Sequence, residues 1–304
     1  MDLQPSMRLN ISAGLISVLV AVLLVAMKLW ALGQTGSLSV AASLADSALD
    51  LMISLGALAA MIYAAKPADD DHAFGHTSVE DLASLAQSIF ILISAGVIAG
   101  SALRRLWTPD RMTIGAEQAG MVVMLASIAL TAGLVIWQGI VARRTGSRVV
   151  AADRLHYIGD MLPAAGAIVS LWAAHRFGLT SIDSVVALAA AAFMALSALR
   201  IGKAAWDALM DRSADPQIIA GIAEIVRVWP GVYGFHDLKT RMAGSRTFVN
   251  LHIELDGAQT LHEAHAIGAA LRRALLDAYP FTDIIIHKDV ARPSQVAARD
   301  ARHD

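Results

Sequence analysis

The stretch LNISAGLISVLVAVLLVAMKLWAL, from Leu9 to Leu32, is the first of six long apolar segments that decide the fold. A helix needs roughly 20 mostly apolar residues to cross a bilayer core about 30 Å thick. The other five segments fall near residues 38–65, 81–107, 113–142, 148–177 and 181–209. We therefore predict a membrane protein with six transmembrane helices. The even number of spans places both termini on one side of the membrane.

The composition supports a membrane protein and excludes other classes. Of the 304 residues, 56% are hydrophobic and only 16% are charged, which is unusual for a soluble globular chain. The formal net charge is -2 and no basic block dominates, so the chain lacks the electrostatic footprint of a nucleic-acid binder. There is no cysteine, so any metal ligands must be histidines and carboxylates. The first apolar segment is longer than a signal-peptide core and has no evident cleavage site, so we interpret it as a retained span.

The composition changes after Asp211 to that of a small α+β domain. Isoleucines at helical spacing over residues 216–228 predict an amphipathic helix, and a Trp-Pro-Gly turn follows it. The alternation of apolar and polar residues from Thr247 to Leu255 predicts a strand with one buried face. A second helix is predicted at about 261–277, and the β-branched run from Asp283 to His287 suits a short strand.

These patterns divide the chain into three parts. We predict a membrane domain at residues 1–211, a folded tail domain at 212–292 and a disordered tail at 293–304.

Two pairs of polar residues interrupt the apolar segments. Asp46 and Asp50 lie four residues apart in the second segment, and His156 and Asp160 repeat this spacing in the fifth, so each pair projects from one face of its helix. A carboxylate in the middle of a membrane costs about 2.5 to 3.5 kcal/mol, so two matched pairs indicate a function beyond helix packing. Three oxygens and one nitrogen meeting at one point suit a tetrahedral Zn²⁺ site and also fit other first-row divalent ions.

Other polar residues admit more ordinary interpretations. Asp153 and Asp183 lie near predicted span ends, where a solvated carboxylate is common, and we assign neither to the site. Three acidic residues and two histidines fall within Asp69–His76, which could attract cations or could be a solvated acidic turn. In the tail, His252 falls on the polar face of its strand, and His287 and Asp289 share a face at i, i+2.

Five motifs give the chain a resemblance to a known family. They are SLADSALD (Ser43–Asp50), PADDDHAFGH (Pro67–His76), LHYIGD (Leu155–Asp160), WPGVYGFHDLKTR (Trp229–Arg241) and IIIHKD (Ile284–Asp289). In this order and at these distances they resemble the cation diffusion facilitator family, and most closely its bacterial zinc and ferrous-iron efflux members. The resemblance covers nearly the whole chain.

The resemblance implies a fold and an activity. It implies six transmembrane helices, a ferredoxin- or metallochaperone-like cytoplasmic domain that binds metal and mediates dimerisation, and a homodimer in a bacterial inner membrane with both termini in the cytoplasm. The implied activity is alternating-access export of Zn²⁺ in exchange for protons, with Fe²⁺, Cd²⁺ or Mn²⁺ as alternative substrates. Such a protein is a secondary active transporter and not an enzyme.

The resemblance also implies three kinds of metal site. The implied transport site is Asp46, Asp50, His156 and Asp160. The implied loop site is Asp69, His72 and His76. The implied site of the cytoplasmic domain is His236, His252, His287 and Asp289, with His265 beside it. By family analogy, Leu155 contributes to a hydrophobic gate.

One position departs from the family pattern, and two other functions stay open. Ser78 stands where close relatives have a lysine, so the pairing of that lysine with the acidic residue matching Asp211 cannot form, and the dimer contact near the membrane surface is in doubt. A metal sensor or scaffold without efficient transport would share every motif. An intramembrane metallohydrolase would also place His and Asp on facing spans, but the chain has no H-E-x-x-H pair.

Overall fold

The computed structural model describes residues 5–35, 38–107, 118–161 and 182–292. The chain divides into two compact units, Met1–Trp206 and Asp207–Asp304. Each unit is described by itself below. The predicted disordered tail at 293–304 lies outside the described residues.

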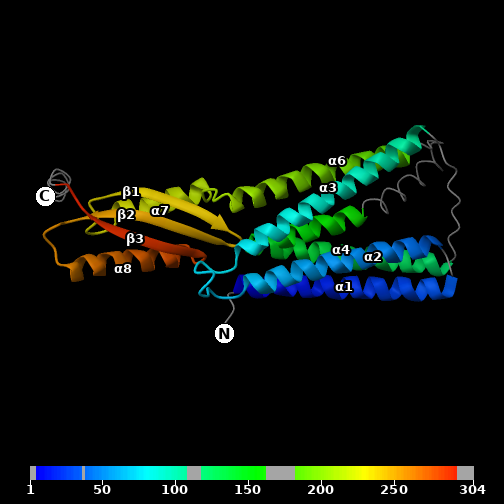
Figure 1. Ribbon diagram of the computed structural model, residues 1–304, viewed down its shortest axis with the longest axis horizontal. Coiled ribbons are helices and arrows are strands. Elements are labelled where there is room, and N and C mark those ends of the chain that lie inside the picture. The colour runs from blue at the N-terminus through cyan, green and yellow to red at the C-terminus, as the bar shows by residue number, and fades with distance from the viewer. Residues whose placement is uncertain (1–4, 36–37, 108–117, 162–181, 293–304) are drawn as a thin grey trace. The chain divides into compact units, whose positions relative to one another are not determined.

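The first unit is a bundle of long apolar helices (Figure 1). Its labelled helices are α1 (Pro5–Thr35), α2 (Leu38–Ala64), α3 (Ser78–Trp107), α4 (Gln118–Thr145) and α6 (Ile182–Leu209), the last of which continues into the second unit. Each of these five contains a stretch long and apolar enough to cross a membrane. The remaining predicted span, 148–177, begins as a helix over residues 148–161, and its later part lies outside the described residues.

Small residues let these helices approach one another closely. α1 packs against α2 and α4. A side-chain carbon added at Gly14 of α1 would lie 3.0 Å from Leu58 of α2. At Gly159, beside Asp160, an added carbon would lie only 2.3 Å from Met194 of α6. Helices in membranes associate by such close packing, because the surrounding lipid is as apolar as their own side chains.

The second unit has the element order α7 (Pro216–Val228), β1 (Gly234–Ala243), β2 (Arg246–Leu255), α8 (Leu261–Ala278) and β3 (Thr282–Val290). The strands lie side by side in the order β1-β2-β3, with β1 antiparallel and β3 parallel to β2 (Figure 1). Both helices begin at caps that the sequence provides. Asp215 accepts a hydrogen bond from the backbone of Gln217, and Thr260 and Glu263 form a reciprocal capping box.

The core of this unit lies between the sheet and its two helices. Four alternate residues of β2 point into it, namely Val249, Leu251, Ile253 and Leu255, and they meet Ile222 and Val226 of α7 and Leu271 and Leu275 of α8. The intervening residues of β2 therefore face the other side, which neither α7 nor α8 covers. This arrangement confirms the predicted α+β fold.

Strand β1 was not predicted, and a β-bulge explains why. The antiparallel register with β2 shifts between His236 and Lys239, where β1 contains one extra residue. Asp237, inside the bulge, adopts a left-handed backbone with φ of 51°. Side chains on either side of the bulge therefore alternate out of phase, and no single period of two runs through residues 234–243.

Candidate metal sites

α2 and the helix over residues 148–161 bring together polar residues of two predicted spans. His156 Nε2 lies 3.1 Å from Asp50 Oδ1 and 3.7 Å from Asp160 Oδ2. One ligand atom from each of these three residues lies within 4.8 Å of the others. His156 and Asp160 share a helix face by their i, i+4 spacing, and Asp50 reaches them from α2. The three side chains can therefore bind a single cation.

Asp46, the fourth predicted ligand, is not part of this close group. It lies one turn before Asp50 on α2, and its side chain is exposed. It is near enough to interact electrostatically with Asp160 and with Lys28 of α1. Its role as a ligand stays a prediction.

Apolar side chains border the group of Asp50, His156 and Asp160, which we call the transport group after its predicted role. The ring of Phe90 in α3 meets the His156 ring edge-on, with 5.8 Å between centroids. Leu155 is buried in a cluster with Ile91 of α3 and Met194 of α6. Leu155 thus lies where helices pack beside the group, and its gating role stays a prediction.

A buried polar network beside the group was missed from the sequence. Asp153, which we expected near a solvated span end, is only 1% exposed, so that expectation is wrong. Its Oδ2 accepts hydrogen bonds from Ser17 Oγ of α1 at 2.7 Å and Gln138 Nε2 of α4 at 2.6 Å. Ser54 of α2 and Tyr157 complete the network, with 2.8 Å between their hydroxyl oxygens.

This network ties together the helices that carry the transport group. A signal for it was present in the sequence, because Asp153 and Tyr157 repeat the i, i+4 spacing of His156 and Asp160, and Ser54 follows Asp50 by the same interval. The energetic cost of burying a carboxylate in an apolar bundle requires such hydrogen-bonding partners.

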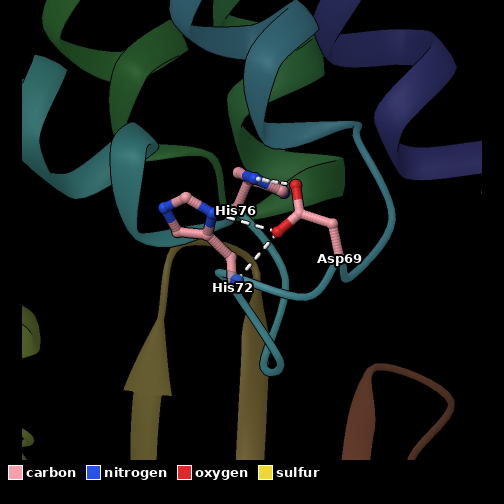
Figure 2. A group of neighbouring side chains, drawn as sticks. All are labelled: Asp69, His72 and His76. Atoms are coloured by element: carbon pink, nitrogen blue, oxygen red, sulfur yellow. Dashed lines mark hydrogen bonds and ion pairs between the residues drawn. The ribbon is translucent and has the colours of Figure 1, made fainter.

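The three loop residues between α2 and α3 also come together (Figure 2). Asp69 Oδ1 lies 3.1 Å from His72 Nδ1, and Asp69 Oδ2 lies 3.2 Å from His76 Nε2. The His76 side chain is 1% exposed and packs edge-on against Tyr63. Among the described residues neither ring nitrogen of His76 has a partner with hydrogen-bond geometry, so the short Nε2 contact is poorly directed.

The electrostatics of this loop favour cation binding. Desolvation acts to raise the pKa of Asp69, but hydrogen bonds from His72 outweigh it and hold the pKa below its usual range. The carboxylate is therefore ionised at neutral pH. One carboxylate and two imidazoles form a suitable set of ligands for Zn²⁺. The arrangement favours the cation-site interpretation over a solvated acidic turn.

In the second unit, three histidines form a row across the sheet. His236 of β1 is the register partner of His252 of β2, and His252 is in turn the partner of His287 of β3. Adjacent rings lie 5.0 and 4.6 Å apart between centroids. Asp289 joins the row, because its carboxylate lies 2.8 Å from His252 Nδ1 and 3.3 Å from both His236 Nε2 and His287 Nε2.

The row lies on the sheet face that α7 and α8 leave open. The hydrogen bond to His252 lowers the pKa of Asp289, and the charges that the neighbouring histidines acquire on protonation act in the same direction. His236, His252 and Asp289 place ligand atoms within 4.8 Å of one another. His265, predicted beside this site, is an exposed residue of α8, which packs on the opposite face. The structure therefore does not bring His265 into the group within one chain.

Asp211, the predicted partner of the family's lysine, has a partner within its own chain. Its Oδ1 lies 3.4 Å from Arg241 Nη1, and the Arg241 guanidinium stacks over the Phe248 ring at 4.3 Å. Ser78 is the first residue of α3. The pairing of Asp211 with Arg241 does not require a lysine at position 78.

The apolar helices bring a buried histidine together with two carboxylates, and the small α+β domain carries a second histidine cluster. Together these features define a membrane transporter of metal cations. The comparisons with known proteins agree. Residues 14–210 match the cation efflux transmembrane domain, and residues 214–290 match the cytoplasmic domain of cation efflux proteins. The chain belongs to the cation efflux family, the cation diffusion facilitators, and is a multi-pass membrane protein.

Individual relatives cover almost the entire chain. It is 40% identical over 282 residues to the cation-efflux pump FieF of Cronobacter sakazakii and 41% identical over 282 residues to FieF of Pectobacterium carotovorum subsp. carotovorum. Each alignment spans 93% of both chains. A solved structure of the metal-bound C-terminal domain of the CzcD transporter from Thermotoga maritima is 24% identical, with a TM-score of 0.24, and covers 24% of this chain and 87% of that one.

Proposed function

We propose that this cation efflux transporter exports divalent transition-metal ions, Zn²⁺ first among them, by exchanging them for protons. The observation that carries the proposal is the convergence of Asp50 from α2 with His156 and Asp160 from the helix at 148–161. Asp46, one turn before Asp50, would complete the ligands when an ion is bound. The relatives named cation-efflux pumps support the direction of transport.

The donor atoms favour ions of the zinc type. One imidazole nitrogen with carboxylate oxygens is a borderline set of ligands, which suits Zn²⁺ and Fe²⁺ better than the oxygen-only sets preferred by Mg²⁺ or Ca²⁺. Cd²⁺ and Mn²⁺ remain alternative substrates of the same geometry. Selectivity among these ions then depends on His156, the single nitrogen ligand.

Exchange with protons follows from the chemistry of the ligands. A bound metal ion needs ionised carboxylates and a free imidazole lone pair, so metal and protons compete for one set of atoms. Protons released when metal enters from the cytoplasm, and taken up on the other side, would couple the two fluxes. The carrier would expose the transport group alternately to each side of the membrane.

The tail domain has a regulatory role in this proposal. Its domain match at residues 214–290 supports a cytoplasmic location and a homodimer, with the membrane domain at 1–211 and the tail domain at 212–292. Metal bound at the histidine row would strengthen the dimer and raise activity when cytoplasmic metal is abundant. The loop group of Asp69, His72 and His76 would be an accessory cation site.

The test is zinc flux in proteoliposomes under an imposed pH gradient. Uphill zinc movement should follow the gradient and reverse when the gradient is reversed, with ionophore controls in place. Asp50→Ala should abolish this flux while leaving a folded protein. Zinc flux that ignores the pH gradient would eliminate proton exchange, and the absence of flux in the unaltered protein would leave a metal sensor or scaffold.

A further inference from the structure

Lys28 is a charged residue inside the apolar part of α1. It lies within the membrane-crossing stretch Ser6–Gln34, where an ammonium group is costly. Lysines near the end of a membrane helix usually avoid this cost by extending the side chain to the interface. The end of α1 is seven residues away at Thr35, or about 10 Å along the helix. An outward route therefore exists.

The Lys28 side chain instead points into the bundle. Its Nζ donates a hydrogen bond to Ser47 Oγ at 2.6 Å, and Ser47 is only 1% exposed. Ser47 belongs to α2 and directly follows Asp46. The ammonium group is thus held against the helix that supplies two of the four proposed metal ligands.

From this position Lys28 interacts electrostatically with all three proposed carboxylate ligands. Burial of the Lys28 side chain opposes its charge, and the carboxylates of Asp50 and Asp46 on α2 and of Asp160 on the helix at 148–161 act against that effect. No motif used above to define the transport site includes α1. The hydrogen bond to Ser47 and the electrostatic interactions with the carboxylates nevertheless make α1 a third helix that contributes charge to the site.

We infer that Lys28 is the built-in counter-ion of the transport site and sets its preference for divalent ions. This inference rests on the proposed function, because it takes Asp46, Asp50 and Asp160 as ligands. Three ionised carboxylates and one ammonium leave two negative charges, which a single divalent ion neutralises. Without Lys28, the loaded site would keep one uncompensated negative charge inside the bundle.

The consequence for transport concerns release of the ion. A carrier must bind its substrate strongly enough to load and weakly enough to let it leave. Removing the ammonium charge strengthens the attraction between the site and a divalent cation, because both lie where the effective dielectric constant is far below that of water. Zinc should then bind more tightly and leave more slowly.

The experiment measures zinc affinity in the full-length protein in detergent by isothermal titration calorimetry. All variants are made in a background protein that carries Asp69→Ala and His252→Ala. In this background the loop group and the histidine row contribute little to the measured zinc binding. In this background Lys28→Met should lower the zinc Kd by about tenfold and slow zinc flux in proteoliposomes. Lys28→Arg, which keeps the charge, should leave the Kd within about twofold of the background value.

An unchanged or higher Kd in folded Lys28→Met protein would overturn the inference. If Lys28→Met does not fold, Lys28→Gln removes the same charge and should lower the zinc Kd in the same way. Asp50→Ala in the same background distinguishes the two levels of the proposal. If it leaves zinc binding intact, the transport-site assignment fails. If it removes binding while the Lys28 variants bind normally, only the role of Lys28 is lost.

Discussion

His252 Nδ1 and Asp289 Oδ2 lie 2.8 Å apart, and this contact joins the middle strand of the tail domain to its parallel neighbour β3. The pair lies on the open face of the sheet, in a separately folded unit. Replacing His252 and His287 together with Ala should weaken activation by metal without eliminating transport. Zinc flux measured against increasing cytoplasmic zinc checks this.

The matched control for that variant is His262→Ala. His262 is an exposed histidine of α8 and belongs to none of the three implied metal sites, so its loss should leave activation unchanged. Complete loss of flux in well-folded double variant would instead place His252 and His287 on the ion path.

The second prediction concerns His156 and ion selectivity. Replacing its imidazole with a carboxylate makes the site oxygen-only, which favours Mn²⁺ over Zn²⁺. His156→Asp should therefore lose discrimination against Mn²⁺, as measured by metal-by-metal flux in proteoliposomes. His262→Asp, the same change at an exposed histidine of α8, is the control. An unchanged ranking of ions in His156→Asp would place selectivity in other residues.

The third prediction follows from Ser78 and from the pairing of Asp211 with Arg241 in one chain. An exposed ion pair contributes only about 0 to 1 kcal/mol, so the missing lysine should loosen the dimer contact near the membrane without dissolving it. Deleting residues from Ala214 onward should shift the protein toward monomer, as seen by light scattering in detergent. Ser78→Lys in the truncated chain should recover part of the dimer. A truncated protein as dimeric as the full chain would contradict the prediction.

The fourth prediction concerns the pH dependence of α8. Hydrogen bonds from the backbone and hydroxyl of Thr260 lower the pKa of Glu263 below its ordinary value of 4.5. A carboxylate whose pKa is lowered in the folded state stabilises that state when the pH is above the ordinary pKa. This stabilisation is lost as the pH falls through the lowered pKa. Glu263→Ala should speed hydrogen exchange in the first turn of α8 at neutral pH, with the difference shrinking toward acid.

Thr260→Ala removes the other half of the same capping box. Loss of a helix cap typically costs about 0.5 to 2 kcal/mol. Its effect on the first turn of α8 should persist at acid pH, because the hydroxyl does not titrate there. An equal effect of Glu263→Ala at every pH would remove the electrostatic explanation.

Much of the fold and of the transport group could be predicted from the sequence, because membrane burial leaves a plain signal. Asp50, His156 and Asp160 are conspicuous as polar residues in apolar spans, and their spacing places them on facing helix surfaces. The histidine row was accessible for a similar reason, since His252 alternates with the core residues of its strand.

Other features depend on partners distant in the sequence. Asp153 resembled a residue at a span end, and only the approach of Ser17 and Gln138 from other helices shows that it is buried. His265 could not be placed, because the side of the sheet on which α8 packs is a property of the tertiary fold. The alternation of side chains along β1 could not be recognised, because the bulge shifts it by one residue.

That bulge also determines which side chain of β1 completes the histidine row. If the register that pairs Lys239 with Asn250 continued back along β1, Asp237 would lie opposite His252. His236 would then lie opposite Ile253 and point into the core. The extra residue and the left-handed backbone of Asp237 hold the imidazole in place instead. A β-branched residue at 237, which resists that backbone conformation, would favour the regular register and withdraw the His236 nitrogen from the row, and an apolar one such as valine would put no donor in its place. The register of the main chain thus decides whether the row holds three imidazoles or two, with His236, His252, His287 and Asp289 all still present in the chain.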